Sequence, residues 1–272
     1  MESKEFEELF RIREEPNYIS QGEEIRLFEA AFRSHIPVIL KGPTGCGKTR
    51  FLEYMSFRLG VPLVTVSCHE DLTASDLTGR YLFIENETVW QDGPLSLAVR
   101  YGGICYLDEI VEARKDTTVV IHSLTDDRRM LFIERTDEMV KAHENFMMVL
   151  SYNPGYQSVV KELKQSTKQR FVNLVFSYPD EKTEARIIES ETGIDRELSE
   201  KLAELGLRLR KLKGYGLDEG VSTRLLVYAG RLIRSGLSPL DACRLAIVHS
   251  ITDAEDIVES LEDTVKLYFG NL

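Results

Sequence analysis

The stretch Gly42-Pro43-Thr44-Gly45-Cys46-Gly47-Lys48-Thr49 decides the fold of this chain. It follows an apolar run, His35 to Leu40, that predicts a buried strand, and it opens a predicted helix that begins at Lys48 and stops at Gly60. A strand, a glycine-rich turn matching GxxxxGK[ST] and a helix form the context that this motif requires. The glycines let backbone N–H groups turn inward, and the start of the helix adds partial positive charge. The sequence therefore predicts a phosphate-binding loop rather than a chance glycine turn.

Every residue of this loop is a candidate contact for a nucleotide. We expect Lys48 to reach the β- and γ-phosphates of ATP, which also makes it a candidate catalytic residue, and Thr49 to ligate Mg²⁺. ATP and Mg²⁺ are accordingly the expected cofactors.

A second signal is the apolar run Gly103 to Leu107, which is followed by Asp108 and Glu109. Many strands end in acids, so this pattern gains its meaning from the phosphate-binding loop upstream. We expect Asp108 to hold the Mg²⁺ shell and Glu109 to polarise the attacking water. A glutamate directly after the aspartate favours hydrolysis of ATP over transfer to a small substrate.

Asn153 follows the predicted strand Phe146 to Ser151. It would lie at the carboxyl edge of the sheet, where open α/β sheets bind their ligands, and its amide could orient the lytic water. The alternative is a turn asparagine before Pro154, which is common.

Two arginines are candidates for contact with the transferred phosphoryl group. Arg170 precedes the predicted strand Val172 to Phe176, and it is either an arginine finger for the ATP of a neighbouring subunit or part of a solvated basic face. Arg224 follows the predicted N-cap Ser222, in the first turn of a helix that Gly236 ends. A cation there opposes the helix dipole, which indicates a role such as contact with the γ-phosphate; a surface arginine is the alternative.

Short apolar runs alternate with helical patterns over the first two-thirds of the chain, which predicts an α/β fold with a parallel five-stranded sheet. The expected strands are His35 to Leu40, Leu63 to Cys68, Gly103 to Leu107, Phe146 to Ser151 and Val172 to Phe176. Two hairpin insertions, Arg80 to Gln91 and Arg129 to Val140, interrupt this pattern. Strand signals largely disappear after Pro179-Asp180. We therefore expect a nucleotide-binding domain over residues 1–180 and a small all-helical domain over residues 181–272.

Composition is ordinary for a globular protein of 272 residues, with 43% hydrophobic and 29% charged residues. The net charge of −11 argues against a nucleic-acid partner, although it leaves room for a local basic patch. The four cysteines are far apart and fit reduced, packed thiols. No apolar run approaches the length that spans a bilayer, and Met1 to Arg13 lacks a signal-peptide core. We expect a soluble, cytoplasmic protein with no membrane association.

These elements, in this order, resemble the AAA+ superfamily, and the two hairpins are similar to the insertions of its MoxR-type members. Longer stretches resemble the CbbQ/NirQ/NorQ/GvpN subfamily, and its CbbQ branch most closely. The resemblance covers nearly the whole chain and rests on GPTGCGKT (42–49), EDLTASDLTGRY (70–81), WQDGPL (90–95), YLDEIVEARKDTTVVIHSLTDDRR (106–129), SYNPGYQS (151–158), LKQSTKQRF (163–171) and GLDEGVSTR (216–224).

The resemblance implies properties that spacing alone does not. Members form hexameric rings with ATP at subunit interfaces, and they work with an adaptor protein (CbbO-like) whose von Willebrand factor A domain recruits the target. Carried over, Asn153 is sensor 1, Arg170 the arginine finger and Arg224 sensor 2. The hairpin near Tyr81 to Trp90 matches the helix-2 insert and that near Arg129 to Val140 the pre-sensor-1 hairpin, both facing the central pore or one ring face.

The implied function is that of a remodelling chaperone, a ring-forming ATPase that reactivates inhibited rubisco by releasing sugar phosphates. Activation of nitric oxide reductase, by aiding metal or cofactor insertion, is a sister function that the sequence does not separate from it. A P-loop small-molecule kinase belongs to a different class, and the pair Asp108-Glu109, the position of Arg170 and the helical C-terminal part argue against it. A DNA-linked AAA+ motor is disfavoured by the acidic balance and the lack of a recognisable DNA-binding module.

Overall fold

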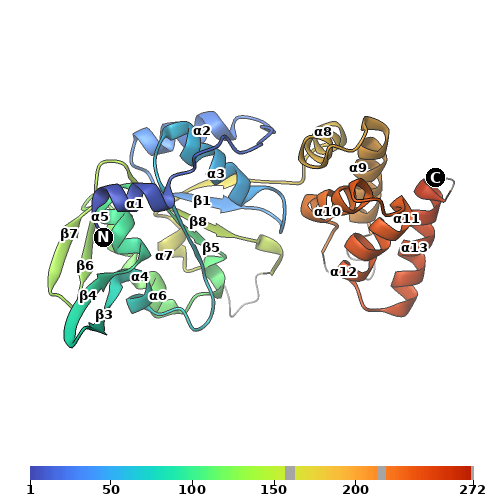
Figure 1. The fold of residues 1–272 in the computed structure, drawn as a ribbon. Coiled ribbons are helices and arrows are strands. Elements are labelled where there is room, and N and C mark those ends of the chain that lie inside the picture. The colour runs from blue at the N-terminus through green and yellow to red at the C-terminus, as the bar shows by residue number, and fades with distance from the viewer. Residues whose placement is uncertain (157–162, 213–218, 271–272) are drawn as a thin grey trace. The chain divides into compact units, whose positions relative to one another are not determined.

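The computed structural model describes residues 1–156, 163–212 and 219–270, which form two compact units (Figure 1). The first unit comprises Met1–Pro16, Gly22–Gly42 and Lys48–Val175, and the second comprises Asn17–Gln21, Pro43–Gly47 and Phe176–Leu272. The division lies between Val175 and Phe176, whereas the sequence placed it near residue 180. Most of the phosphate-binding loop, Pro43–Gly47, is grouped with the second unit. Residues 157–158 and 216–218, at the ends of two of the quoted motifs, lie outside the described residues.

The first unit is built on a five-stranded parallel sheet, as the sequence predicted, and its strand order is β2-β5-β8-β1-β9. Its strands are β1 (Val38–Lys41), β2 (Leu63–Ser67), β5 (Gly103–Asp108), β8 (Phe146–Tyr152) and β9 (Val172–Val175). The two strands next to each other at the centre, β5 and β8, are buried almost throughout, which explains their continuous apolar sequence. Strand β1 begins only at Val38, because His35, with a φ of 54°, still belongs to the turn after the preceding helix.

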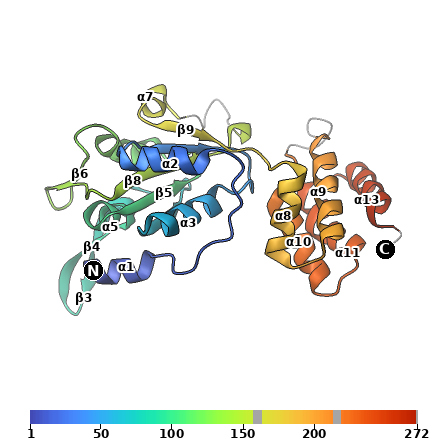
Figure 2. The ribbon, with the colours of Figure 1, turned by 90° about the horizontal axis from the view of Figure 1, so that it is seen from above.

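Helices of the first unit surround this sheet (Figure 2). They are α1 (Ser3–Phe10), α2 (Glu24–Arg33), α3 (Lys48–Leu59), α4 (Ala74–Thr78), α5 (Pro94–Tyr101), α6 (Lys115–Val120) and α7 (Gln165–Lys168), with short 3-10 turns η1 (Ile110–Glu112), η2 (His122–Leu124) and η3 (Pro154–Tyr156). Helix α3 starts directly after the loop and buries Phe51, Leu52 and Met55. Helix α5 packs on β2, β5 and β8. The loop thus connects a buried strand to a helix that has one buried face.

Both predicted hairpins are present, and they lie side by side at one end of the first unit (Figure 1, left). Strand β3 (Gly79–Ile84) pairs antiparallel with β4 (Glu87–Asp92), and β6 (Met130–Ile133) with β7 (Glu138–Lys141). The Tyr81 hydroxyl donates to the Arg135 carbonyl at 3.4 Å. Arg100 of α5 forms ion pairs with Asp92 of the first hairpin, at 2.9 Å, and with Glu138 of the second.

The aromatic side chains of the first hairpin have different environments. Trp90 is partly buried against the core, and its Nε1 donates to Asp92 at 2.8 Å. Tyr81 meets Trp90 edge-on, with ring centroids 5.1 Å apart, whereas Phe83 is 73% exposed. Trp90 therefore anchors the hairpin, and Phe83 is presented to solvent.

The second unit is helical, as predicted, and has its own core of aliphatic side chains that includes Ile188, Leu202 and Leu226. Its helices are α8 (Glu181–Thr192), α9 (Arg196–Arg210), α10 (Thr223–Arg234), α11 (Pro239–Cys243), the π-helix η4 (Arg244–Val248), α12 (His249–Ile251) and α13 (Glu255–Phe269). Side-chain caps start α8, α9, α10 and α11. Over the residues described in both units, no helix has the length and apolar character needed to cross a membrane.

Candidate nucleotide site

The loop from Gly42 to Thr49 joins β1 to α3, and two of its glycines have backbone conformations that other residues rarely adopt. Gly45 has a φ of 68° and Gly47 a φ of 101°. A Cβ atom on Gly45 would also lie 2.7 Å from Cβ of Ser222, too close for any side chain. The turn therefore needs glycine at both positions, and such turns make backbone concavities that bind phosphate oxygens.

Lys48 folds back across this loop. Its Nζ donates to the carbonyl oxygen of Gly42 at 2.9 Å. The ammonium group thus lies over the loop that would hold the phosphates, and a phosphate oxygen would offer it a charged acceptor in place of a neutral one.

Two hydroxyl groups fix the carboxylate of Asp108 at the end of β5. Tyr106 and Ser151 both donate to its Oδ1. The Tyr106 hydroxyl also interacts with the Thr49 side chain, which brings Thr49 and Asp108 to one place. Burial first, and the Asp108 charge second, raise the pKa of Tyr106, so its hydroxyl stays a neutral donor. Because both hydroxyls use Oδ1, they leave Oδ2 to a metal ion, and a carboxylate with a hydroxyl fits Mg²⁺.

Glu109 is held in an uncommon backbone conformation. Its φ of 55° and ψ of 47° lie in the left-handed region, which non-glycine residues adopt rarely and mostly at functional sites. Its N–H donates to Oγ of Ser151 at 3.1 Å. One buried serine therefore touches both members of the acid pair.

The sequence interpretation missed Ser151 as a site residue, since it treated the serine only as the end of a strand. The signal was in the parallel register, which aligns Leu107 of β5 with Leu150 of β8. The next residue on each strand, Asp108 or Ser151, then lies at the same carboxyl edge. That pairing follows from strand order, which the linear sequence does not state.

We expect Ser151→Ala to lower kcat for ATP hydrolysis by about ten- to hundredfold, because positional errors near 1 Å at a catalytic group have effects of that size. The affinity for nucleotide should stay near its normal value, since the phosphate-binding loop is unchanged. Steady-state hydrolysis and nucleotide titration measure the two quantities. Ser96→Ala is the matched control, because it removes another fully buried hydroxyl, one that donates to the Thr78 carbonyl. Equal turnover in the two variants would show that Ser151 does not position the acids.

Asn153 lies directly after β8, at the carboxyl edge of the sheet, and is nearly buried. Its Oδ1 accepts a hydrogen bond from the Gly155 N–H at 2.9 Å. The turn interpretation therefore holds for this oxygen, and the bond also fixes the direction of the amide. Its role toward the lytic water stays a prediction.

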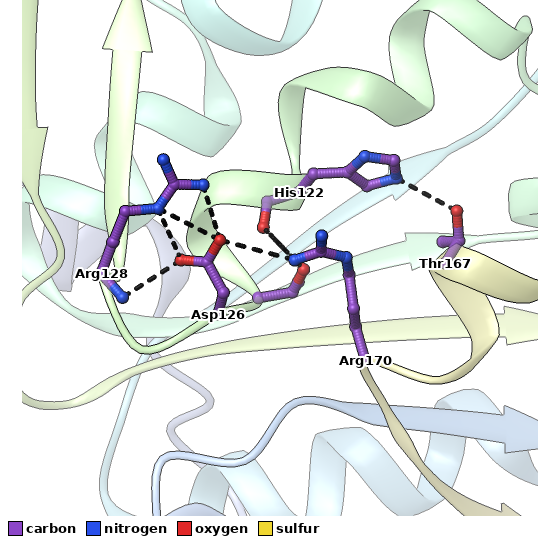
Figure 3. Close-up of polar contacts among 6 residues, drawn as sticks. His122, Asp126, Arg128, Thr167 and Arg170 are labelled. Atoms are coloured by element: carbon purple, nitrogen blue, oxygen red, sulfur yellow. Dashed lines mark hydrogen bonds and ion pairs between the residues drawn. The ribbon is translucent and has the colours of Figure 1, made fainter.

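Arg170 lies between α7 and β9, and its side chain is 34% exposed. Its Nη1 donates to the His122 carbonyl at 3.3 Å and lies 3.5 Å from Oδ2 of Asp126 (Figure 3). Asp126 is in turn bound by Arg128. Arg170 is thus bound by specific acceptors rather than only solvated, and its action on a neighbouring subunit stays a prediction.

Arg224 is exposed in the first turn of α10, whose N-cap is Ser222. The Ser222 hydroxyl accepts from the Leu225 N–H at 3.3 Å. Within the second unit, Cβ of Arg224 lies 3.3 Å from the point where a Cβ on Gly45 would be. The start of α10 therefore lies beside the phosphate-binding loop, as a contact from Arg224 to the γ-phosphate requires.

A buried ion pair holds the start of α10 in place. Glu184 is fully buried, and Arg210 donates to both of its oxygens at 2.6 and 2.7 Å. Thr223 donates to Glu184 at 2.6 Å, and Nε of Arg210 donates to the Val221 carbonyl at 2.7 Å. The pair therefore holds Val221 and Thr223, the residues on either side of Ser222, and removing one partner would leave a buried charge.

Tyr178 connects this ion pair to the loop within the second unit. Its ring lies 4.1 Å from the Arg210 guanidinium carbon, and its hydroxyl donates to the Thr44 carbonyl at 3.1 Å. The sequence interpretation missed Tyr178, Glu184 and Arg210, because nothing in their spacing indicates that they meet.

Two family models match the chain. One is the AAA domain (dynein-related subfamily), over residues 37–171, and the other is the CbbQ/NirQ/NorQ C-terminal model, over residues 184–268. The protein CbbQ of Hydrogenophilus thermoluteolus is 55% identical over 96% of this chain and 98% of that protein. This chain belongs to the CbbQ/NirQ/NorQ family.

Two further relatives carry the other names of the family. The denitrification regulatory protein NirQ of Pseudomonas aeruginosa is 54% identical over 93% of this chain and 97% of its own length. The protein NorQ of Paracoccus denitrificans is 54% identical over 94% of both chains. As a CbbQ/NirQ/NorQ protein with an AAA domain, the chain binds nucleotide and is an ATP hydrolase.

Solved structures share the fold of this CbbQ/NirQ/NorQ protein. A putative ATPase from Cytophaga hutchinsonii matches with a TM-score of 0.51 at 15% identity, covering 99% of this chain and 97% of that one. A RuvB variant from Thermotoga maritima matches with a TM-score of 0.54 at 17% identity, covering 90% of this chain and 70% of that one. At such identities the likeness shows the fold alone.

Proposed function

We propose that this protein forms a hexameric ring and uses ATP hydrolysis to remodel a client enzyme, with inhibited rubisco as the client. The observation that carries the proposal is the 55% identity to CbbQ across almost the whole chain. The motif resemblance to the CbbQ branch supplies rubisco as client and an adaptor with a von Willebrand factor A domain as partner.

The residues of one subunit would divide the chemistry as follows. The loop N–H groups and Lys48 hold the phosphates, while Thr49 and Asp108 would hold Mg²⁺, which neutralises charge on the phosphate oxygens. Glu109 takes a proton from the attacking water. In this proposal Asn153 orients that water, and Arg224 contacts the γ-phosphate of its own subunit.

The two hairpins are the proposed contact to the client. Apolar side chains stand out on both of them: Phe83 is 73% exposed, Met139 54% and Phe132 43%. Tyr81 and Arg100 join the two hairpins that carry these side chains. Exposed apolar surface of this kind is typical of protein-binding sites.

Activation of nitric oxide reductase is the second candidate function. NirQ, whose name describes a denitrification regulator, is 54% identical to this chain, only slightly less than CbbQ. The choice of rubisco as client therefore rests on the motif resemblance to the CbbQ branch and not on this difference in identity.

A reconstitution assay compares the two clients directly. We expect this protein, ATP and the adaptor to restore carboxylation by sugar-phosphate-inhibited rubisco, and the Glu109→Gln protein to restore none, because remodelling needs hydrolysis. Nitric oxide reductase incubated in the same way should gain no activity. Activation of the reductase without recovery of rubisco would reverse the assignment of the client, and activation of neither enzyme would contradict both candidates.

A further inference from the structure

Two segments far apart in the sequence meet at Arg170. The first contains the turn η2 and Asp126, and the second contains α7 and Arg170 (Figure 3). Nε2 of His122 and Oγ1 of Thr167 form a hydrogen bond of 3.1 Å between them. Arg170 Nη1 adds the contacts to the His122 carbonyl and to Asp126, at 3.3 and 3.5 Å. The Arg170 guanidinium therefore contacts both ends of the segment from His122 to Asp126.

Asp126 is itself held firmly. The backbone N–H of Arg128 donates to its Oδ1 at 3.1 Å, and Nη2 of the same arginine lies 2.7 Å from its Oδ2. Hydrogen bonds from Arg128 lower the pKa of Asp126 to about 2, so the carboxylate is charged at any physiological pH. Arg128 thus makes most of the bonds that fix the direction of this carboxylate, and Arg170 adds one longer contact (Figure 3).

The contact to Arg170 is much weaker than the contact to Arg128. At 3.5 Å, with an Arg170 side chain one-third exposed, solvent screens this ion pair, so it holds the guanidinium only weakly. In the part of the chain that the structure describes, both contacts of Arg170 run through Nη1, and Nε and Nη2 make none. One nitrogen is therefore held while the remaining N–H groups can meet an incoming phosphate in a forked geometry.

We propose that Asp126 is a positioning residue, which orients Arg170 toward the ATP of a neighbouring subunit without binding it too tightly to act. The inference rests on the proposed role of Arg170 as an arginine finger. Two other roles of Asp126 predict a different turnover for a variant that lacks its charge, so the measurement distinguishes them from positioning. A carboxylate that traps Arg170 would inhibit, so its removal would raise turnover; a purely local contact would leave turnover unchanged.

The test variant is Asp126→Asn. It removes the charge and keeps an oxygen that can accept from the Arg128 N–H, so the turn should be preserved. We expect kcat to fall about tenfold and KM for ATP to stay within about twofold, because a displaced finger affects the transition state rather than nucleotide binding. Asp127→Asn is the matched control: it makes the same change of charge at the next residue, which is exposed. Melting temperature and assembled size, measured for both, report whether either variant is misfolded.

Mixing experiments assign Asp126 to one side of the subunit interface. Asp126→Asn should recover activity when mixed with Lys48→Ala, which supplies an intact finger, and should not recover with Arg170→Ala, which also lacks one. Recovery of activity on mixing Asp126→Asn with Arg170→Ala would overturn the inference. So would an Asp126→Asn protein whose turnover equals or exceeds that of Asp127→Asn. If Arg170→Ala is inactive while Asp126→Asn is normal, only the positioning role fails; if Arg170→Ala is fully active, the proposed finger fails as well.

Discussion

Glu109→Gln is expected to bind ATP with nearly normal affinity and to lose about 10²–10⁴-fold in turnover, the range that a general base contributes. The amide keeps the size of the side chain but cannot take a proton from the attacking water. The backbone supports this expectation, since Glu109 is held at a φ of 55° by the bond from its N–H to Ser151 rather than by its carboxylate. The position of residue 109 should therefore survive the substitution.

Lys48→Ala is expected to act on nucleotide binding, the step before hydrolysis, and to weaken the affinity for ATP severely. Titration with a fluorescent ATP analogue and a phosphate-release assay, run on both variants, separate the two defects. Lys201→Ala, which removes a lysine from α9 that pairs with Glu197, should change neither quantity. A Glu109→Gln protein that hydrolyses ATP at the normal rate would contradict its role as the base.

The second large effect is expected at Arg170. An arginine finger contributes about 10³–10⁵-fold to turnover, whereas an ordinary exposed arginine contributes almost nothing. We therefore expect Arg170→Ala to be nearly inactive while it still binds ATP. Arg196→Ala is the matched control, because Arg196 is also an arginine paired with a carboxylate, that of Glu200, and is 79% exposed.

Trans action of Arg170 has two signatures. Specific activity of the unaltered protein should rise with its concentration as subunits assemble. A mixture of Arg170→Ala and Lys48→Ala should recover part of the activity, because some interfaces combine the intact finger of one with the intact loop of the other. Normal turnover by Arg170→Ala alone would contradict the arginine-finger role of Arg170, whatever activity the mixture shows.

The parts of the fold that depend on local pattern could be predicted from the sequence. Gly42 to Thr49 carries its own signal, since glycine is required where φ is positive and helix α3 follows at once. The apolar strands β5 and β8 and both hairpins are likewise local patterns. The start of β1 was misplaced, because the positive φ of His35 is set by the end of α2 rather than by its own side chain.

The parts that depend on strand order and packing could not be predicted. Ser151 meets Asp108 only because β8 lies next to β5, and Glu184 meets Arg210 only because α8 and α9 pack together. The contact between Asp126 and Arg170 joins residues from separate turns. Each of these contacts involves a residue that the motifs indicated or lies close to one. The motifs therefore point to the candidate reacting groups, whereas the residues that contact them are brought in by tertiary structure.

The hairpins described above also have a mechanical consequence. Helix α5 begins just after the first hairpin, bonds to both hairpins through Arg100, and leads through Gly102 into β5, the strand that ends at Asp108. A load applied to the first hairpin would therefore pass along one continuous piece of chain to Asp108, and Arg100 would connect the second hairpin to the same helix. Because packed interiors transmit strain, force from the proposed client on the first hairpin would reach Asp108 and Glu109 through α5 and β5.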